Sequence, residues 1–156
     1  MNGTNSITIA ITRKTVLDRI KMGAYYIGES VKGELQEVAA MLQACDDDDE
    51  VLNDFFMEGN TELANILQKY MGKSTFAVTG SSATTAASYT ISSVDNFNES
   101  NLSGLTNAMY DFLVDFGLKE WSKPVPNTAQ YYEEKIKEDT QAIRELCCHR
   151  KKPDRS

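Results

Sequence analysis

The sequence predicts a mainly α-helical protein, a four-helix bundle-like domain with an inserted β-hairpin and an extended N-terminal arm. Three observations predict this fold. Apolar residues recur at spacings of three and four over several long stretches, which is the period of an amphipathic helix. A segment rich in Ser, Thr and Ala separates the second of these stretches from the third. The first residues alternate Ile with smaller side chains, which is the period of a half-buried strand.

Length and composition indicate one globular domain. The chain has 156 residues, of which 41% are hydrophobic and 25% charged, and this balance argues against global disorder. No run approaches the roughly 18 apolar residues of a membrane span, and the first residues lack the basic start and apolar block of a signal peptide. We therefore expect no membrane partner, and a protein that is made in a cytoplasm and used either there or in a particle assembled there.

We divide the chain into an extended arm at 1–12, a helical domain at 13–149 with the hairpin inserted at about 74–94, and a basic tail at 150–156. In the arm, "SITIAIT" presents every second side chain as Ile. A strand at a terminus needs an edge to pair with, either inside the monomer or in a neighbouring subunit. The candidate partner-binding residues of the arm are Ile7, Ile9 and Ile11.

The first helix is expected over about 15–44, opened by the capping pattern "TVLD". Such a helix is about 45 Å long. Its glycines each cost up to about 1 kcal/mol relative to alanine. They mark a bend, a break, or places where another helix approaches closely, and they are Gly23, Gly28 and Gly33.

Three further helices follow. The second is expected over 47–71, with Gly72 as its stop, and the third begins near 98–102. The fourth follows the break "KPVPN", is capped by Asn127 with Gln130, and lies at the periphery. Aromatic residues of the second and third helices are expected to form the core between them, namely Phe55, Phe56, Tyr70, Phe112, Phe116 and Trp121.

The hairpin is predicted by two short alternating stretches on either side of "TGSSATTAA". A hairpin alone is only marginally stable in water. It therefore needs a surface to lie on, which is either the chain's own helices or another subunit. Its candidate partner-binding residues are Phe76, Val78, Tyr89 and Ile91.

The acidic run "ACDDDDEVLNDFF" raises the question of a calcium site. A calcium loop of the EF-hand type needs Gly at its sixth position and Glu at its twelfth. Counting from Asp46 gives Val51 at the sixth, and counting from Asp48 gives Asn53. We reject the loop and expect the acids to begin a helix, with Asp46 or Asp47 as cap and Glu50 as its partner.

The cysteines and the tail offer little chemistry. Three cysteines cannot form a disulfide framework, and a thiolate–imidazole metal site at Cys147–His149 lacks a second group of ligands. We expect no metal and no cofactor.

The net charge is −7, although residues 150–156 carry four basic side chains and one acidic one. The tail residues expected to contact a partner are Arg150, Lys151, Lys152 and Arg155.

No catalytic constellation is visible. The chain has one histidine, no "GxSxG" and no phosphate-binding Gly-rich loop. Pairs of carboxylates at helical spacing, such as Glu58 with Glu62, are common on solvated helix faces. We expect a helical interaction protein, not an enzyme.

The order of the segments adds a resemblance. An acidic turn leads into "VLNDFFMEGNTELANILQKYM". A hairpin ending in "YTISSVDNFNESN" comes next, then "LTNAMYDFLVDFGLKEWSK", a Tyr-rich helix and the basic terminus "HRKKPDRS". Over most of residues 46–156 this resembles small virion structural proteins of tailed phages and prophages of gut Bacteroidales, similar to head–tail connector (adaptor) or tail-completion proteins.

The resemblance implies a non-enzymatic ring homo-oligomer at the head–tail junction of a virion, stacked beneath a portal protein and next to connector or tail proteins. It implies a helical wall from Thr15–Met71 and Leu102–Leu146, a contacting hairpin at Thr75–Val94, and docking segments at Ile7–Ile11 and Arg150–Arg155. A negative wall lets genomic DNA slide through the lumen without specific binding.

Two other classes remain open. One is a cytoplasmic helical adaptor or regulatory protein that uses the same apolar faces for protein–protein contacts. The other is a small metal-dependent protein that uses Asp46–Glu50 or Cys147–His149. A ring subunit should leave edges unsatisfied in the monomer, whereas an adaptor should bury its hairpin on itself.

Overall fold

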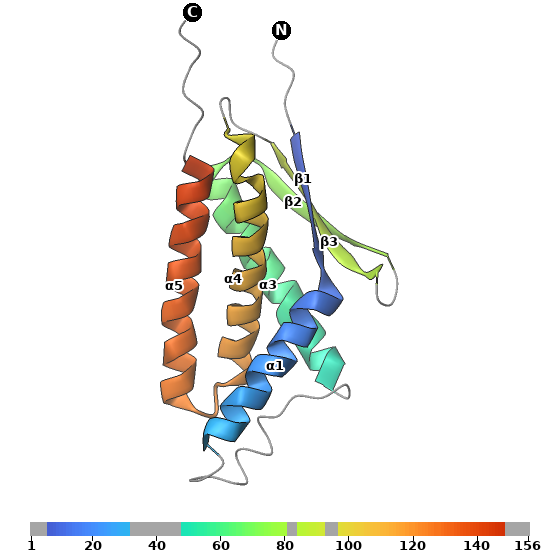
Figure 1. The fold of residues 1–156 in the computed structure, drawn as a ribbon. Helices are drawn as coiled ribbons and strands as arrows, with labels where there is room; N and C mark the ends of the chain where they lie inside the picture. Colours follow the sequence, from blue (N-terminus) through green and yellow to red (C-terminus); the bar gives the residue numbers. More distant parts are fainter. Residues whose placement is uncertain (1–5, 32–47, 81–83, 93–96, 149–156) are drawn as a thin grey trace, which may run out of the picture.

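The computed structural model describes residues 6–31, 48–80, 84–92 and 97–148. Within these ranges the chain is mainly helical, with four α-helices, one short 3-10 helix and a small antiparallel sheet, which confirms the predicted mainly helical class. The elements are, in chain order, β1 (Ser6–Thr12), α1 (Arg13–Val31), α3 (Asp49–Tyr70), β2 (Ser74–Thr79), β3 (Ala86–Ser92), η3 (Glu99–Asn101), α4 (Leu102–Trp121) and α5 (Pro126–Cys148) (Figure 1).

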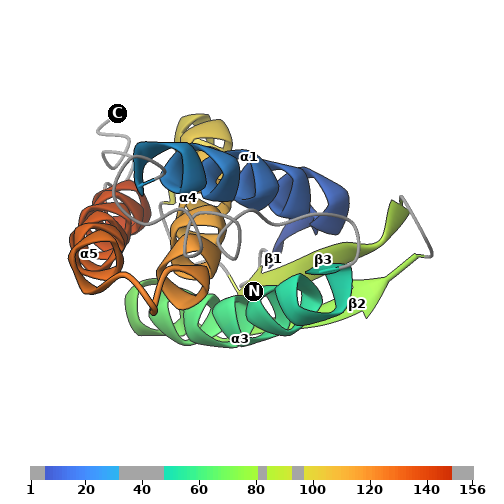
Figure 2. The ribbon, with the colours of Figure 1, turned by 90° about the horizontal axis from the view of Figure 1, so that it is seen from below.

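The central helix is α4. It packs along α5 and also contacts α1, α3 and β1, and Figure 2 shows these three helices around it, with the sheet on the side away from α5. A helix in this position must be apolar on most of its faces. The buried residues of α4 fulfil this requirement, and they include Leu105, Met109, Phe112, Leu113, Val114, Phe116 and Leu118.

The aromatic core predicted between the second and third helices is present between α3 and α4. Phe56 of α3 is buried, as are Phe112 and Phe116 of α4, whose ring centroids lie 6.3 Å apart. Stacked aromatic pairs at this separation add to the stabilisation from burial alone. Phe55, Tyr70 and Trp121 are partly buried at the rim of the same core.

The helix α1 crosses α4 through glycines. A Cβ at Gly23 would lie 2.7 Å from Cδ1 of Leu118, and Gly117 of α4 similarly faces Ile20. Gly23 is therefore a place of close helix approach, one of the alternatives that the sequence left open. The predicted first helix begins two residues early, at Arg13, and is described as far as Val31. The remainder of its predicted range, with Gly33, lies outside the described residues.

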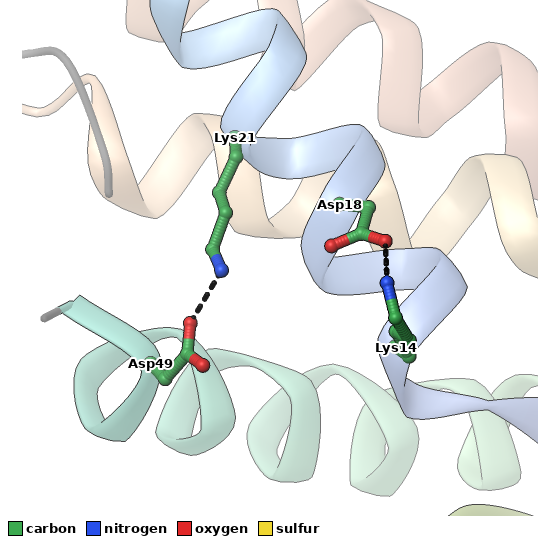
Figure 3. A network of polar contacts seen from close by, with 4 residues as sticks. All are labelled: Lys14, Asp18, Lys21 and Asp49. Atoms are coloured by element: carbon green, nitrogen blue, oxygen red, sulfur yellow. Dashed lines mark hydrogen bonds and ion pairs between the residues drawn. The ribbon is translucent and has the colours of Figure 1, made fainter. Parts of the chain in front are cut away.

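The acidic run begins α3. Asp48 occupies the N-cap position without a side-chain capping hydrogen bond, so the predicted capping box with Glu50 is not formed by this residue; Asp46 and Asp47 lie outside the described residues. Asp49 instead reaches Lys21 of α1, with Oδ1 2.6 Å from Nζ (Figure 3). Carboxylates in a first turn also interact favourably with the helix dipole.

The helix α5 begins at Pro126, so the predicted cap at Asn127 is wrong. Asn127 lies inside the first turn. Proline suits the first helical position because its φ is already helical and its missing N–H would have no partner there. The amide of Ala129 donates to the carbonyl of Val125 at 3.0 Å. Apart from its start, α5 follows the prediction, and its buried residues are Ile143 and Cys147.

The three strands lie in the order β1-β3-β2, with both neighbouring pairs antiparallel. The predicted hairpin is confirmed by β2 and β3, in which Phe76 is opposite Tyr89. The prediction of an extended arm is wrong for residues 6–12. They pair with β3 along their whole length, with Ile9 opposite Tyr89, because three strands with an apolar face are far more stable than a hairpin with a free arm.

Candidate assembly surface

The sheet has one apolar face and one polar face. Side chains alternate between the faces along each strand. The inner face packs on the helices and carries Ile7, Ile9, Ile11, Ser74, Phe76, Val78, Ala87, Tyr89 and Ile91. The outer face consists of Ser, Thr and Ala, including the cross-strand row Thr8, Thr90 and Thr75.

Tyr89 fixes the sheet to α3. Its ring is fully buried and stacks on Phe76, with centroids 5.5 Å apart. Its hydroxyl donates to the side-chain oxygen of Asn60, and Nδ2 of Asn60 donates to the carbonyl of Phe56 at 2.8 Å. Burial raises the pKa of Tyr89 well above its ordinary value. The hydroxyl therefore stays protonated and holds β3 on the helix.

The outer edge of β2 carries unpaired backbone groups. The amide of Ser92 donates to the carbonyl of Lys73 at 2.9 Å, so Lys73 and Ser92 are a hydrogen-bonded pair. Because such pairs alternate along an antiparallel ladder, the odd-numbered residues of β2 bond to β3. The N–H and C=O groups of Ser74, Phe76 and Val78 point away from β3. No described residue hydrogen-bonds to the backbone of Phe76 or Val78 on that side.

The outer edge of β1 is closed at one end by α4. The amide of Arg13 donates to the carbonyl of Thr85 at 2.9 Å, so the even-numbered residues of β1 point outward by the same alternation. The outward amide of Thr12 donates to the hydroxyl of Tyr110 in α4 at 2.9 Å. The two edges of the sheet therefore differ, because α4 bonds to the end of the β1 edge whereas no described residue bonds to the backbone of Phe76 or Val78 on the β2 edge.

The edge of β2 also lacks the usual protection against pairing. Natural edge strands carry charges, proline or bulges that prevent contact with other chains. The strand "STFAVT" contains none of these residues, and its register with β3 is continuous. Lys73 precedes the strand, and Val78 is 42% exposed on its inner face. An uncharged, regular edge of this kind is suited to accepting another strand.

The structure separates the predicted partner-binding residues into groups. Val78 is exposed, and Ile7 and Phe76 are partly buried. The assignment of four others as surface contacts is wrong for the folded chain because their side chains belong to the core, and these are Ile9, Ile11, Tyr89 and Ile91. The tail residues Arg150, Lys151, Lys152 and Arg155 lie outside the described residues.

Two features were missed by the sequence reasoning. One is an exposed stripe on α1, formed by Met22, Tyr25 and Tyr26, whose two tyrosine rings meet edge to face at 5.8 Å. Their spacing of three and four was a visible signal on the face opposite the predicted apolar stripe. The other feature is a pair of aspartates between α4 and α5, which no local pattern of residues predicts.

Asp115 and Asp139 meet across the contact between α4 and α5, where Oδ2 of Asp139 is buried with no donor among the described residues, so a hydrogen bond between the two carboxyl groups requires a proton on one of them. Burial, and then the bond to Asp115, raise the pKa of Asp139 to about 8. Burial also raises the pKa of Asp115. Two carboxyl groups in one partly buried place cannot both ionise easily. The pair therefore holds a proton near neutral pH.

The part of the chain that the structure describes contains no group of three or more residues able to hold a metal ion. One alternative from the sequence is a metal site at Cys147–His149. Cys147 is buried and Cys148 is exposed, and His149 lies outside the described residues. Among the described helices, none is long and apolar enough to cross a membrane. No protein-family model, curated protein or solved structure matches the chain.

Proposed function

We propose that this protein is a non-enzymatic virion structural protein, a subunit of a head–tail connector or adaptor ring that links a portal protein to the tail. The observation that carries the proposal is the unpaired, uncharged edge of β2. An exposed edge without protective residues is a site at which a neighbouring subunit can add a strand. The segments within residues 46–156 resemble connector proteins, and this resemblance is the reason for proposing a connector ring and not another assembly.

The helices are suited to the wall of such a ring in this proposal. The helices α1, α3 and α5 pack around α4, and the sheet lies on the side away from α5 (Figure 2). The whole chain has a net charge of −7. A negative wall repels phosphate, so genomic DNA passes through the lumen without specific binding. The basic residues of 150–156 dock into the adjacent ring.

A second candidate is a cytoplasmic helical adaptor or regulatory protein. The observation that favours it is the attachment of the hairpin to the chain's own helices through Tyr89 and Asn60. This attachment leaves only one side of the hairpin for a partner. A monomeric adaptor would use the β2 edge to bind one extended peptide, whereas a ring subunit would use it to bind a neighbour.

The test is the mass of the purified protein in solution, alone and mixed with extract of virions whose structural genes include it. The connector proposal expects the protein to join a portal-containing complex. Val78→Pro should abolish joining, because proline removes the outward N–H of the edge. Val78→Thr keeps the N–H and the β-branched shape, and should join normally. A protein that ignores the portal-containing complex while binding other cytoplasmic proteins would favour the adaptor.

The tail gives an independent arm of the test. A chain without residues 150–156 should keep the unfolding midpoint of the full chain and lose its place in the complex. If the shortened chain joins as well as the full chain, the tail is not a docking segment.

A further inference from the structure

The described edge of β2 can pair with a second copy of itself. The outward residues Ser74, Phe76 and Val78 are evenly spaced about Phe76. In an antiparallel pair with a two-fold axis at Phe76, Ser74 of one copy lies opposite Val78 of the other. All three outward N–H groups and all three outward C=O groups of each strand then have partners, because residues that point outward form the hydrogen-bonded pairs of the new ladder.

The charges permit this register. No residue of β2 or β3 is charged, whereas the chain as a whole carries −7. Two copies of an acidic protein repel each other over most approaches, and an uncharged strand is a place where they can meet without opposing carboxylates. The nearest cation, Lys73, lies opposite Thr79 of the other copy, so the two lysines are at opposite ends of the joint.

The inner face also gains contacts. Phe76 is only partly buried and Val78 is 42% exposed in the monomer. In the symmetric pair Phe76 lies beside its counterpart, and each Val78 lies beside Ser74 of the other copy. Two aromatic residues directly opposite each other, as the two copies of Phe76 are here, form one of the cross-strand pairs that stabilise sheets.

We infer that the free protein forms a symmetric dimer through β2, so that two three-stranded sheets become one six-stranded sheet. The inference goes beyond the proposed function, because it concerns the free protein. A head-to-tail ring needs a contact between two different surfaces. The dimer covers the edge that the connector proposal assigns to a neighbour, and it protects that edge from uncontrolled pairing before assembly.

The test uses the register. In the proposed pair Thr75 lies directly opposite Ala77 of the other copy, on the outer face where both are exposed. A chain with Thr75→Lys and Ala77→Lys therefore places lysine opposite lysine twice. A matched chain with Thr75→Glu and Ala77→Lys places glutamate opposite lysine twice. Neither chain alters the core, and circular dichroism with thermal unfolding confirms that each is folded.

Sedimentation of the purified full-length chains over a range of concentrations gives the dimer dissociation constant. We expect a dimer for the natural chain, weakening by at least about tenfold in the lysine–lysine chain, and recovery in the glutamate–lysine chain. A natural chain that stays a monomer at every concentration, or a dimer that neither variant changes, overturns the inference.

The same samples separate this inference from the connector proposal. A monomer that still joins the portal-containing complex contradicts the inference alone. A dimer that fails to join that complex contradicts the connector proposal alone.

Discussion

Gly117 of α4 lies directly against the Cδ1 methyl of Ile20 in α1, with no room between them for a side chain. This contact and the reciprocal one between Gly23 and Leu118 fix how closely α1 crosses α4. Ile20 is fully buried at the crossing. The position of α1 sets the start of the sheet, because α1 follows β1 without a break.

Gly117→Ala is expected to lower the free energy of unfolding by about 1–3 kcal/mol, since the new Cβ overlaps the Cδ1 methyl of the buried Ile20, which must either change rotamer in a packed core or push the helices apart. The gain in helix propensity, about 1 kcal/mol, offsets part of this cost. Gly104→Ala is the matched control, because its Cβ would lie 3.2 Å from the end of the Leu146 side chain. Chemical denaturation measures both, and a Gly117→Ala chain more stable than the natural one would contradict the crossing described.

Tyr89→Phe is expected to destabilise the fold by about 1–3 kcal/mol. The substitution leaves the side-chain oxygen of Asn60 buried without the hydroxyl that donates to it. Tyr26→Phe is the control, because Tyr26 is 65% exposed, and its effect should stay within about 0.5 kcal/mol. Equal effects of the two substitutions in thermal unfolding would show that the bond to Asn60 does not hold the sheet.

Ile11→Ala is expected to cost about 2–5 kcal/mol, because Ile11 is fully buried in the core. Ala10→Ser, on the exposed outer face of the same strand, should change the stability little. The comparison distinguishes a strand of the domain from a docking arm. Equal, small effects of both substitutions on the denaturation midpoint would support the prediction that the N-terminal strand is a docking arm.

Asp139→Asn is expected to stabilise the protein above neutral pH. The folded pKa of Asp139 is raised from 3.8 to about 8, so between these values the folded chain binds a proton that the unfolded chain lacks. Stability is therefore greatest below about pH 4 for this group and falls as the pH rises toward 8. Asp111, Lys135 and Arg19 also act on the pair, and the two cations favour the ionised form of Asp115.

Asparagine cannot ionise, so Asp139→Asn removes the loss of stability that accompanies rising pH. The expected gain in the free energy of unfolding is on the order of 1 kcal/mol at pH 8 after allowance for solvent screening. The unfolding midpoints of the natural chain and the Asp139→Asn chain are compared from about pH 5 to about pH 9. Glu133→Gln is the control, because Glu133 is exposed on the same helix and is not among the groups that act on Asp115 and Asp139. An Asp139→Asn chain with the same pH dependence as the natural chain would show that the pair holds no proton.

Much of the helical layout could be predicted from the sequence because it depends on local periodicity. The ranges of α3 and α4 follow from apolar spacing, and the hairpin follows from alternation around a turn. The position of β1 could not be predicted, because alternation identifies a strand but not its partner. Ile9 and Ile11 show the alternation of a half-buried strand whether that strand pairs inside the monomer or in a neighbouring subunit.

The candidate surface was predictable only in part. The alternation of β2 predicts Phe76 and Val78 as contact residues, and in the structure Val78 is exposed. The unpaired edge itself depends on the order β1-β3-β2 and on the register, and neither is encoded within β2. Asp115 and Asp139 are 24 positions apart and lie on two different helices. Their contact depends on how α4 and α5 face each other, which no local sequence pattern predicts.

The central claim is that the edge of β2 is free in the monomer and becomes paired on assembly. Hydrogen exchange of individual amides, measured by nuclear magnetic resonance in dilute and assembled protein, tests it directly. Phe76 and Val78 should exchange fast in the dilute monomer and become protected on assembly. The amides of Thr75 and Ala77, which bond to β3, should be protected in both states and serve as references. Protection of Phe76 and Val78 in the monomer, or fast exchange in every assembled state, would contradict the claim.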